Sequence, residues 1–483
     1  MTLSFSFSTS PRIIRSGVTD GAPSFALLFS LFFSLLLPLL FISACTSGPA
    51  ATSEPNPDTP AMAGPESVGM SSEALDRLDH VLEAYVDRGE LPGYQLLVAR
   101  RGQVIHESVY GQMDIEDQRA LRPDTIYRIY SMSKVITGVA TMIAYEQGSF
   151  LLNDPISKYL PALADMGVME WDDNGDTRIV PAEREITILD LLRHTSGFSY
   201  HFIASPPLGQ QYTDASITPG VRPLPVTTSL GNAGPDQEAT LEDMVERLGG
   251  LPLVIQPGSA WHYGINMDVL GRLIEVSSGQ SFPDFLEEHV FGPLGMSDTR
   301  FYVPDAKIER FATLYGTKPE GGLETLDPPL TSTYRQPPAM PGGGAGMVST
   351  ANDYMRFALM LTNGGSLDGT RLLSRRTARL MMSNHLPEAD FGDRPLRAIA
   401  GNAYANEGLG VGFGLSGSVI TDPAFTGLPV SEGTFGWGGA ASTFFWSDPQ
   451  EEIAVVFMTQ LLPSNTYTLR GDLMKGVNAG LMD

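Results

Sequence analysis

A hydroxyl and an amine lie three positions apart in the segment Ser131-Met132-Ser133-Lys134. Residues at positions i and i+3 of a helix share one face, so these two side chains can touch if the segment is helical. Burial disfavours the ammonium form of a lysine, and the free amine that results can take the proton of Ser131. The pattern therefore predicts a serine nucleophile activated by Lys134. The alternative is a chance match in which Lys134 extends to the surface.

A second proton carrier is predicted at Tyr263. Residues 261–266 read Trp-His-Tyr-Gly-Ile-Asn and follow Pro257-Gly258, so they form a loop directly before a helix expected at 267–277. A tyrosine in such a loop can reach into a cleft, and a nearby lysine ammonium eases the loss of its phenol proton. An ordinary core aromatic is the alternative. His262 is left outside the predicted site.

Backbone donors for an oxyanion are predicted near residues 435–440, which read Phe-Gly-Trp-Gly-Gly-Ala. Paired glycines at the start of an edge strand let the backbone approach a ligand closely. The N–H of Ala440 would then join the N–H of Ser131, at its helix N-terminus, in holding an oxyanion. A plain turn is the alternative.

The elements that must position these groups can also be predicted. The segment from Ser131 to about Gln147 is apolar on nearly every side, which indicates a helix inside the protein. Residues 71–88 predict an amphipathic helix, and 94–99 with 103–110 predict a hairpin. Further predicted elements are helices at 282–290 and 352–361, a hairpin of 442–446 with 453–459, and a closing helix at 467–482.

Together these elements predict an α+β fold, an α/β sandwich in which an antiparallel sheet flanked by helices is built from both chain ends. A mostly helical domain is inserted between the two ends. We expect a first α/β part at residues 65–127, a helical domain with the nucleophile helix at 128–330, and a second α/β part at 331–483. Residues 199–238 hold many Pro, Gly, Thr and Ser and predict irregular surface or a flap.

The order of the serine-lysine pair, the tyrosine loop and the glycine-rich strand resembles the serine β-lactamases of class C and their carboxylesterase and D-peptidase relatives. The resemblance runs from about Glu66 to the C-terminus. The stretches that carry it are residues 65–70 (PESVGM), 193–198 (RHTSGF), 293–296 (PLGM) and 343–347 (GGAGM). It implies a β-lactamase/transpeptidase-like fold. It also implies that Ser131 is acylated while Lys134 and Tyr263 share general-base and general-acid duty.

Two departures from the family pattern narrow the expected activity. Trp437-Gly438-Gly439 stands where the β-lactamases have a Lys/His-Thr/Ser-Gly triplet, whose cation helps to hold a carboxylate. The family's Tyr-x-Asn has Ile265 at its third position, with Asn266 one place later. We expect Trp437, its two glycines and Asn266 to bind substrate, and a serine hydrolase most suited to small uncharged acyl esters. The alternatives are a β-lactamase or D-amino-acid peptidase, or a non-catalytic penicillin-binding-like sensor.

Charge and composition exclude several other classes. The net charge of -24 argues against nucleic-acid partners, which need clustered Lys and Arg. The seven histidines are scattered without an H-E-x-x-H pattern, so we expect no metal and no cofactor. His194 is interpreted as a structural histidine, because no G-x-S-x-G elbow accompanies it. The sequence does not indicate an oligomeric state.

The N-terminal segment predicts export. A basic start, an apolar run from Phe25 to Ile42 and small residues before Cys45 are typical of a lipoprotein signal peptide at 1–44. We expect a lipidated Cys45, a flexible tether at 45–64 and, because Thr46 rather than Asp follows, an outer-membrane anchor facing the periplasm. The alternative is an uncleaved membrane anchor, since a run of 18 mostly apolar residues can just span a bilayer.

Overall fold

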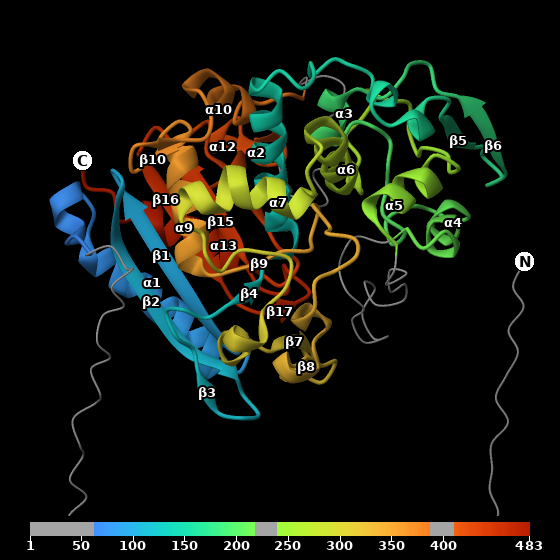
Figure 1. The fold of residues 1–483 in the computed structure, drawn as a ribbon. Coiled ribbons are helices and arrows are strands. Elements are labelled where there is room, and N and C mark those ends of the chain that lie inside the picture. The colour runs from blue at the N-terminus through green and yellow to red at the C-terminus, as the bar shows by residue number, and fades with distance from the viewer. Residues whose placement is uncertain (1–61, 218–238, 387–409) are drawn as a thin grey trace, which may run out of the picture. The chain divides into compact units, whose positions relative to one another are not determined.

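Strand β1 (Gly93–Arg100) pairs with strands from both ends of the chain. Its neighbours are β2 (Gln103–Asp114) and β16 (Ile453–Met458), both antiparallel to it. The computed structural model describes residues 62–217, 239–386 and 410–483, and it places β1 inside an eight-stranded sheet of order β12-β13-β14-β15-β16-β1-β2-β3 (Figure 1). The remaining strands are β3 (Arg119–Ala120), β12 (Val411–Phe413), β13 (Ser418–Ile420), β14 (Phe435–Gly438) and β15 (Phe444–Asp448). The predicted antiparallel sheet built from both chain ends is confirmed.

Helices cover both faces of this sheet. Successive side chains of a strand point to opposite faces, and the neighbours Phe444 and Phe445 of β15 show what lies on each. Phe445 packs against Tyr354 of α9 (Ala351–Thr362), with ring centroids 4.9 Å apart. Phe444 lies 4.6 Å beneath the guanidinium of Arg470 in α13 (Leu469–Asn478). Helix α1 (Ser72–Asp87) packs on α13 and so belongs to the second layer.

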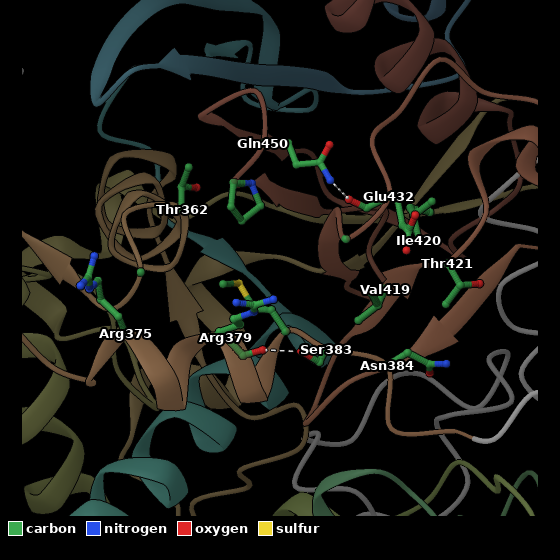
Figure 2. Close-up of a pocket in the computed structure, with 14 residues that line it drawn as sticks. Thr362, Arg375, Arg379, Ser383, Asn384, Val419, Ile420, Thr421, Glu432 and Gln450 are labelled. Carbon is green, nitrogen blue, oxygen red and sulfur yellow. Dashed lines mark hydrogen bonds between the residues drawn. The ribbon is translucent and has the colours of Figure 1, made fainter.

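A cavity of about 630 Å³ lies beside the sheet at its β13 end. Its wall is formed by α10 (Arg375–Met381), the end of α9, β13 and the turn between β15 and β16 (Figure 2). Arg379 and Thr362 line it, whereas the predicted catalytic residues do not. The cavity is therefore separate from the group of residues that the sequence singled out.

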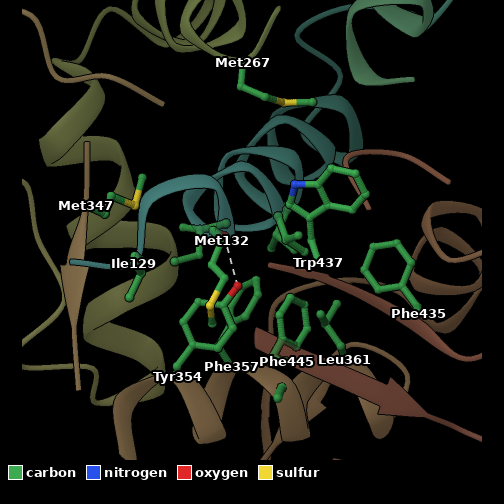
Figure 3. Packing of buried hydrophobic residues seen from close by; sticks show 14 of the residues in the cluster. Ile129, Met132, Met267, Met347, Tyr354, Phe357, Leu361, Phe435, Trp437 and Phe445 are labelled. Atoms are coloured by element: carbon green, nitrogen blue, oxygen red, sulfur yellow. Dashed lines mark hydrogen bonds between the residues drawn. The ribbon is translucent and has the colours of Figure 1, made fainter. Parts of the chain in front are cut away.

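The helix that carries the predicted nucleophile is α2 (Ser133–Glu146), preceded by a 3₁₀ turn at Tyr130–Met132. Twelve consecutive residues of α2, from Ser133 to Ala144, are buried, which confirms the predicted internal helix. The hydroxyl of Tyr354 donates a hydrogen bond of 2.9 Å to the carbonyl of Met132 (Figure 3). That bond ties α9 to the turn in front of α2.

A helical region lies between the two parts of the sheet along the chain, as predicted. It contains α3 (Ile188–Leu192), α4 (Leu208–Asp214), α5 (Leu241–Leu248), α6 (Asn266–Ser278), α7 (Phe282–Leu286) and α8 (Gly292–Leu294), with a π-helical turn at Glu287–Phe291. Helix α6 packs against α2, α3 and α5, so the loop before α6 is held close to the start of α2. The shorter strands are β4 (Tyr127–Arg128) with β9 (Val348–Ser349), β5 (Gly167–Trp171) with β6 (Thr177–Pro181), β10 (Ser366–Leu367) with β11 (Thr370–Arg371), and β17 (Leu461–Leu462), β7 (Leu314–Thr317) and β8 (Leu323–Asp327).

Several predictions fall on residues that the structure does not describe. They are the signal peptide, Cys45, the tether up to residue 61, and residues 218–238 of the predicted flap. Where the description begins, the N–H of Ala63 donates a 3.1 Å hydrogen bond to the carbonyl of Val104 in β2. Within the described ranges, none of the helices has the length and apolar character that a bilayer crossing requires.

Candidate active site

The hydroxyl of Ser131 receives hydrogen bonds from both predicted proton carriers. The Nζ of Lys134 donates to the Oγ of Ser131 over 3.2 Å. The hydroxyl of Tyr263 donates to the same oxygen over 2.9 Å. Ser131 is partly exposed, while Lys134 is 1% exposed. The structure thus brings together three side chains from two distant segments, at a serine that solvent can reach.

A backbone carbonyl holds the amine of Lys134 from the other side. The Nζ donates a 2.6 Å hydrogen bond to the carbonyl of Gly344. A Cβ on Gly344 would lie 2.6 Å from the Oδ2 of Asp268 and 3.1 Å from the hydroxyl of Tyr200, so only glycine fits there. The sequence indicated this glycine-rich segment only through the family resemblance and did not predict its contact with the lysine. The run of glycines was the available signal.

The backbone before the nucleophile has an unusual conformation. Tyr130 has φ of 41°, in the left-handed region that a residue with a bulky side chain rarely adopts. Its side chain is buried in a small cluster with Leu314, Ala345 and Ala441, which holds the residue in place. Residues in such conformations persist only where their surroundings fix them, and they concentrate at functional sites. The turn presents Ser131 at the start of the buried helix.

The loop that carries Tyr263 is locked onto the segment after α3. The N–H of His262 donates to the carbonyl of His194 over 2.8 Å, and the N–H of Ile265 donates to the carbonyl of Ser199 over 3.3 Å. Gly264 lies so close to the carbonyl of Phe198 that a Cβ would collide with it. These contacts fix the position of the phenol relative to α2.

Trp437 contacts the phenol through its indole nitrogen. Its Nε1–H donates a 3.3 Å hydrogen bond to the hydroxyl oxygen of Tyr263, and the two ring centroids are 5.8 Å apart. Trp437 is 6% exposed and packs edge-on against Phe413. The sequence predicted that Trp437 binds substrate and did not predict this hydrogen bond to Tyr263.

The glycine-rich strand was expected at the edge of a sheet, and this expectation was wrong. Strand β14 lies inside the sheet, between β13 and β15. Its C-terminal end, rather than an exposed edge, approaches the nucleophile. A Cβ on Gly439 would collide with the carbonyl of Ile129, so the strand end lies directly against the backbone just before Ser131. A Cβ on Gly438 would collide with the guanidinium of Arg470. A backbone neighbour therefore accounts for Gly439, whereas the group beside Gly438 is the movable end of a long side chain.

Ala440 follows in the turn after β14 and is partly exposed. The turn is closed by two bonds, from the N–H of Gly439 to the carbonyl of Thr443 and from the N–H of Ser442 to the carbonyl of Gly439. The backbone at Ala440 and that at Ser131 therefore belong to two segments in direct contact. The two predicted oxyanion donors therefore lie on neighbouring segments, and an oxyanion hole further requires that both N–H groups point to one position.

The structure does not bring Asn266 to this group. Its side chain is completely buried, with its amide nitrogen 2.6 Å from the Nδ1 of His194 and its amide oxygen 2.5 Å from the hydroxyl of Ser196. Asn266 is the first residue of α6, so its side chain points into the protein behind the tyrosine loop. The prediction that Asn266 contacts substrate does not fit this placement.

Burial shapes the protonation of the groups around the three central residues. Burial lowers the pKa of His194 well below 6.5, and the positive charge of Lys134 lowers it further. Burial also lowers the pKa of His262 to about 4. It raises the pKa of Tyr200, which the neighbouring Tyr263 and Asp268 raise further. Near neutral pH both histidines and Tyr200 are therefore uncharged.

Known proteins resemble this chain over most of its length. The family model described as Beta-lactamase matches residues 78–475. Protein Rv1367c of Mycobacterium tuberculosis is 34% identical over 394 residues, which cover 80% of this chain and 90% of that protein. Esterase EstB of Burkholderia gladioli is 29% identical over 420 residues, which cover 83% of this chain and 94% of that protein. The solved structure of "EstCE1, a hydrolase with promiscuous acyltransferase activity" has a TM-score of 0.68 at 26% identity, over 85% of this chain and 99% of that one.

Proposed function

The chain belongs to the beta-lactamase family, as the sequence resemblance predicted, and we propose that this serine hydrolase cleaves small uncharged acyl esters through an acyl-enzyme on Ser131. The observation that carries the proposal is the shared contact of Ser131 with Lys134 and Tyr263. A serine hydroxyl is a weak nucleophile until a neighbouring base takes its proton. Here two groups that can move protons are already within reach of it.

The proposed reaction has two steps. The Oγ of Ser131 attacks the ester carbonyl, and its proton passes to the deprotonated member of the Lys134–Tyr263 pair, which is either the phenolate beside an ammonium or the amine beside a phenol. The N–H groups of Ser131 and Ala440 hold the oxyanion, and the alcohol leaves after taking the proton back through Tyr263. Water then attacks the acyl-enzyme along the same route and releases the acid. A preformed oxyanion donor contributes roughly 10²–10³ in rate.

Preference for uncharged esters is supported by Trp437 and Asn266. An indole replaces the cation that would hold a substrate carboxylate, and its N–H is directed to Tyr263. The side-chain amide of Asn266 is bonded to protein and does not offer itself to an amide substrate. Both placements give a β-lactamase or D-amino-acid peptidase less support than an esterase.

Transfer of the acyl group to an alcohol is the second candidate function. It is supported by the structural relative EstCE1, a hydrolase with promiscuous acyltransferase activity, whose likeness extends over 85% of this chain. Acyl transfer needs the same acyl-enzyme, with an alcohol in place of water as the attacking group. Product analysis with and without added short-chain alcohols separates the two reactions.

A substrate panel tests the proposed function. Purified protein without residues 1–44 is assayed with p-nitrophenyl acetate, butyrate and octanoate, with nitrocefin, and with a D-Ala-D-Ala peptide. We expect ester turnover that disappears in Ser131→Ala, with little turnover of the other two substrates. Nitrocefin or peptide turnover above ester turnover would reject the proposal. Folded protein that turns over no substrate and whose Ser131 is not labelled by a fluorophosphonate would favour a sensor.

We further propose that the protein is exported and attached to a membrane, facing the periplasm, through a lipid on Cys45. The support is the basic start, the apolar run and the small residues that precede this cysteine. Mass spectrometry of the mature N-terminus tests the proposal. We expect the mature protein to begin with a lipid-modified Cys45 and the Cys45→Ala variant to lack this modification. An intact N-terminus at Met1 would contradict the proposal.

A further inference from the structure

His194 lies directly behind the tyrosine of the proposed site. It is the second residue after α3, is completely buried and has φ of 58°. Its imidazole centroid is 4.8 Å from the ring centroid of Tyr263, 5.6 Å from that of Phe413 and 5.9 Å from that of Trp261. A polar ring is thus enclosed by three aromatic side chains, one of which donates to Ser131.

A chain of hydrogen bonds fixes which imidazole nitrogen carries the proton. The hydroxyl of Ser196 accepts a 3.1 Å bond from the N–H of Phe198, so its own hydrogen is free for the amide oxygen of Asn266 at 2.5 Å. The amide nitrogen of Asn266 then donates to the Nδ1 of His194 over 2.6 Å. Nδ1 is therefore an acceptor, and in neutral imidazole the proton resides on Nε2.

The Nε2–H of His194 has no hydrogen-bond partner among the described residues although it is buried. A buried donor without a partner costs free energy, so its retention calls for an explanation. The groups around the ring are the aromatic side chains named above, whose π faces are weak acceptors. Tyr263 is the nearest of them, and its phenol carries negative charge when it acts as a base.

We propose that His194 is a positioning residue for Tyr263: Asn266 keeps it neutral with its proton on Nε2, and its ring supports the phenol and stabilises the phenolate. This inference rests on the part of the proposed function that assigns Tyr263 to the activation of Ser131. From residue 266, one place later than in the family pattern, the asparagine bonds to the histidine behind the loop.

The other titratable groups near this ring are consistent with a neutral imidazole. Lys134 acts on it from α2 and His262 from the tyrosine loop itself, while Tyr200, in the segment after α3, packs against Tyr263. A second positive charge beside Lys134 would be repelled by it, and the complete burial of the ring disfavours charge as well. The imidazole can therefore influence Tyr263 only as a neutral dipole and as a packing surface.

Three variants test the inference. His194→Phe keeps a planar ring but removes the imidazole N–H. His194→Gln has a carbonyl oxygen that can accept from Asn266 and an NH2 group that can replace the Nε2–H donor. Asn266→Leu removes the donor that fixes the tautomer. We expect kcat for p-nitrophenyl butyrate to fall about tenfold to a hundredfold in His194→Phe, because small misplacements of a catalytic group have effects of this size. KM should change less than about threefold, and the glutamine variant should recover most of the loss.

The pH profile separates positioning from mere packing. The imidazole dipole stabilises the phenolate, so its loss should make the phenol harder to deprotonate. In His194→Phe the midpoint of the acidic side of the kcat/KM–pH profile should therefore shift to higher pH by about one unit, and in Asn266→Leu by less. A folded His194→Phe with unchanged kcat and an unchanged limb would overturn the inference. His385→Phe is the control, because His385 lies after α10 and its Nε2 bonds to the carbonyl of Leu380.

A covalent probe keeps this inference distinct from the proposed function. The rate at which a fluorophosphonate labels Ser131 reports activation of the hydroxyl without any ester substrate. If the wild type turns over no ester but His194→Phe slows labelling, the proposed function fails and the inference on His194 stands. If esters are turned over and the histidine variants match the wild type in turnover and labelling, only the inference on His194 fails. Should His194→Phe not fold, Asn266→Leu decides in the same two assays.

Discussion

The indole N–H of Trp437 lies 3.3 Å from the hydroxyl oxygen of Tyr263. The phenol oxygen therefore has two neighbours, the indole donor and the Oγ of Ser131 at 2.9 Å. When the phenol loses its proton, the indole N–H remains as a donor to the anion. The indole N–H of Trp437 is a neutral donor at the position where, by the resemblance, the β-lactamases have a cation. It stabilises the phenolate of Tyr263 but does not attract a substrate carboxylate.

Removal of this single donor should slow the reaction without weakening substrate binding. In Trp437→Phe the aromatic contact with Tyr263 is retained and the N–H is lost. One hydrogen bond contributes about 1 kcal/mol, which corresponds to roughly a fivefold to tenfold loss in kcat. Steady-state kinetics with p-nitrophenyl butyrate measure it. A rise in KM with constant kcat would show that Trp437 acts on the substrate instead.

Substitution of the nucleophile should abolish activity and leave the fold intact. Ser131→Ala removes the atom that is acylated, and we expect activity to fall by roughly 10³ or more. The melting temperature should change little, because Ser131 is partly exposed. Intact-mass spectrometry after treatment with a fluorophosphonate should show one adduct on the wild type and none on the variant. An adduct on the variant would assign the nucleophile elsewhere.

The tyrosine loop should not tolerate a methyl group at Gly264. A Cβ at this position would collide with the carbonyl of Phe198, so Gly264→Ala must separate the loop from its support. We expect a loss of about 1–3 kcal/mol in the free energy of unfolding, as for other overpacked sites. Urea denaturation measures it. Gly250→Ala is the matched control, since its nearest neighbour would lie 3.4 Å away.

Stability should fall as the pH drops from about 6.5 to about 4. The pKa of His262 is about 4 in the folded protein and 6.5 ordinarily, because burial disfavours its charged form. Between these values the unfolded chain binds a proton that the folded chain excludes, so His262 contributes up to about 3 kcal/mol of destabilisation. Its contribution is absent above pH 6.5. Urea denaturation across this range should give a flatter curve for His262→Gln, and an equally steep curve would contradict the assignment.

The sequence predicted the order of the elements better than their positions in space. Hydrophobic periodicity and turn residues were sufficient for α1, α2 and the two hairpins, because these depend on local pattern. The place of β14 within the sheet depends on a pairing with β13 that no local signal reports. A strand as short as β14 has the same residue pattern at the edge of a sheet as inside it, so only the observed pairing shows that it is an inner strand.

The site shows the same division between local and distant information. The contact of Ser131 with Lys134 follows from helix spacing and was predicted. The carbonyl of Gly344 that holds Lys134 lies 210 residues further along the chain, and backbone carbonyls leave no mark in side-chain types. Asn266 was predicted to bind substrate but bonds to His194, 72 residues earlier in the chain. Spacing in the sequence does not show in which direction its amide points.

The pairing of β1 with β16 has a consequence for how the protein is made. The hydroxyl of Thr459 donates to the carbonyl of Gly93, 366 residues earlier. The inner strand β1 therefore lacks its partner β16 until residues 453–458 have been synthesised. Contacts this distant in sequence form slowly, and the exposed strand can meanwhile pair with other chains. Chaperone capture of the nascent chain should persist until residue 458 emerges, and any premature stop before that point should yield insoluble fragments rather than a smaller folded hydrolase.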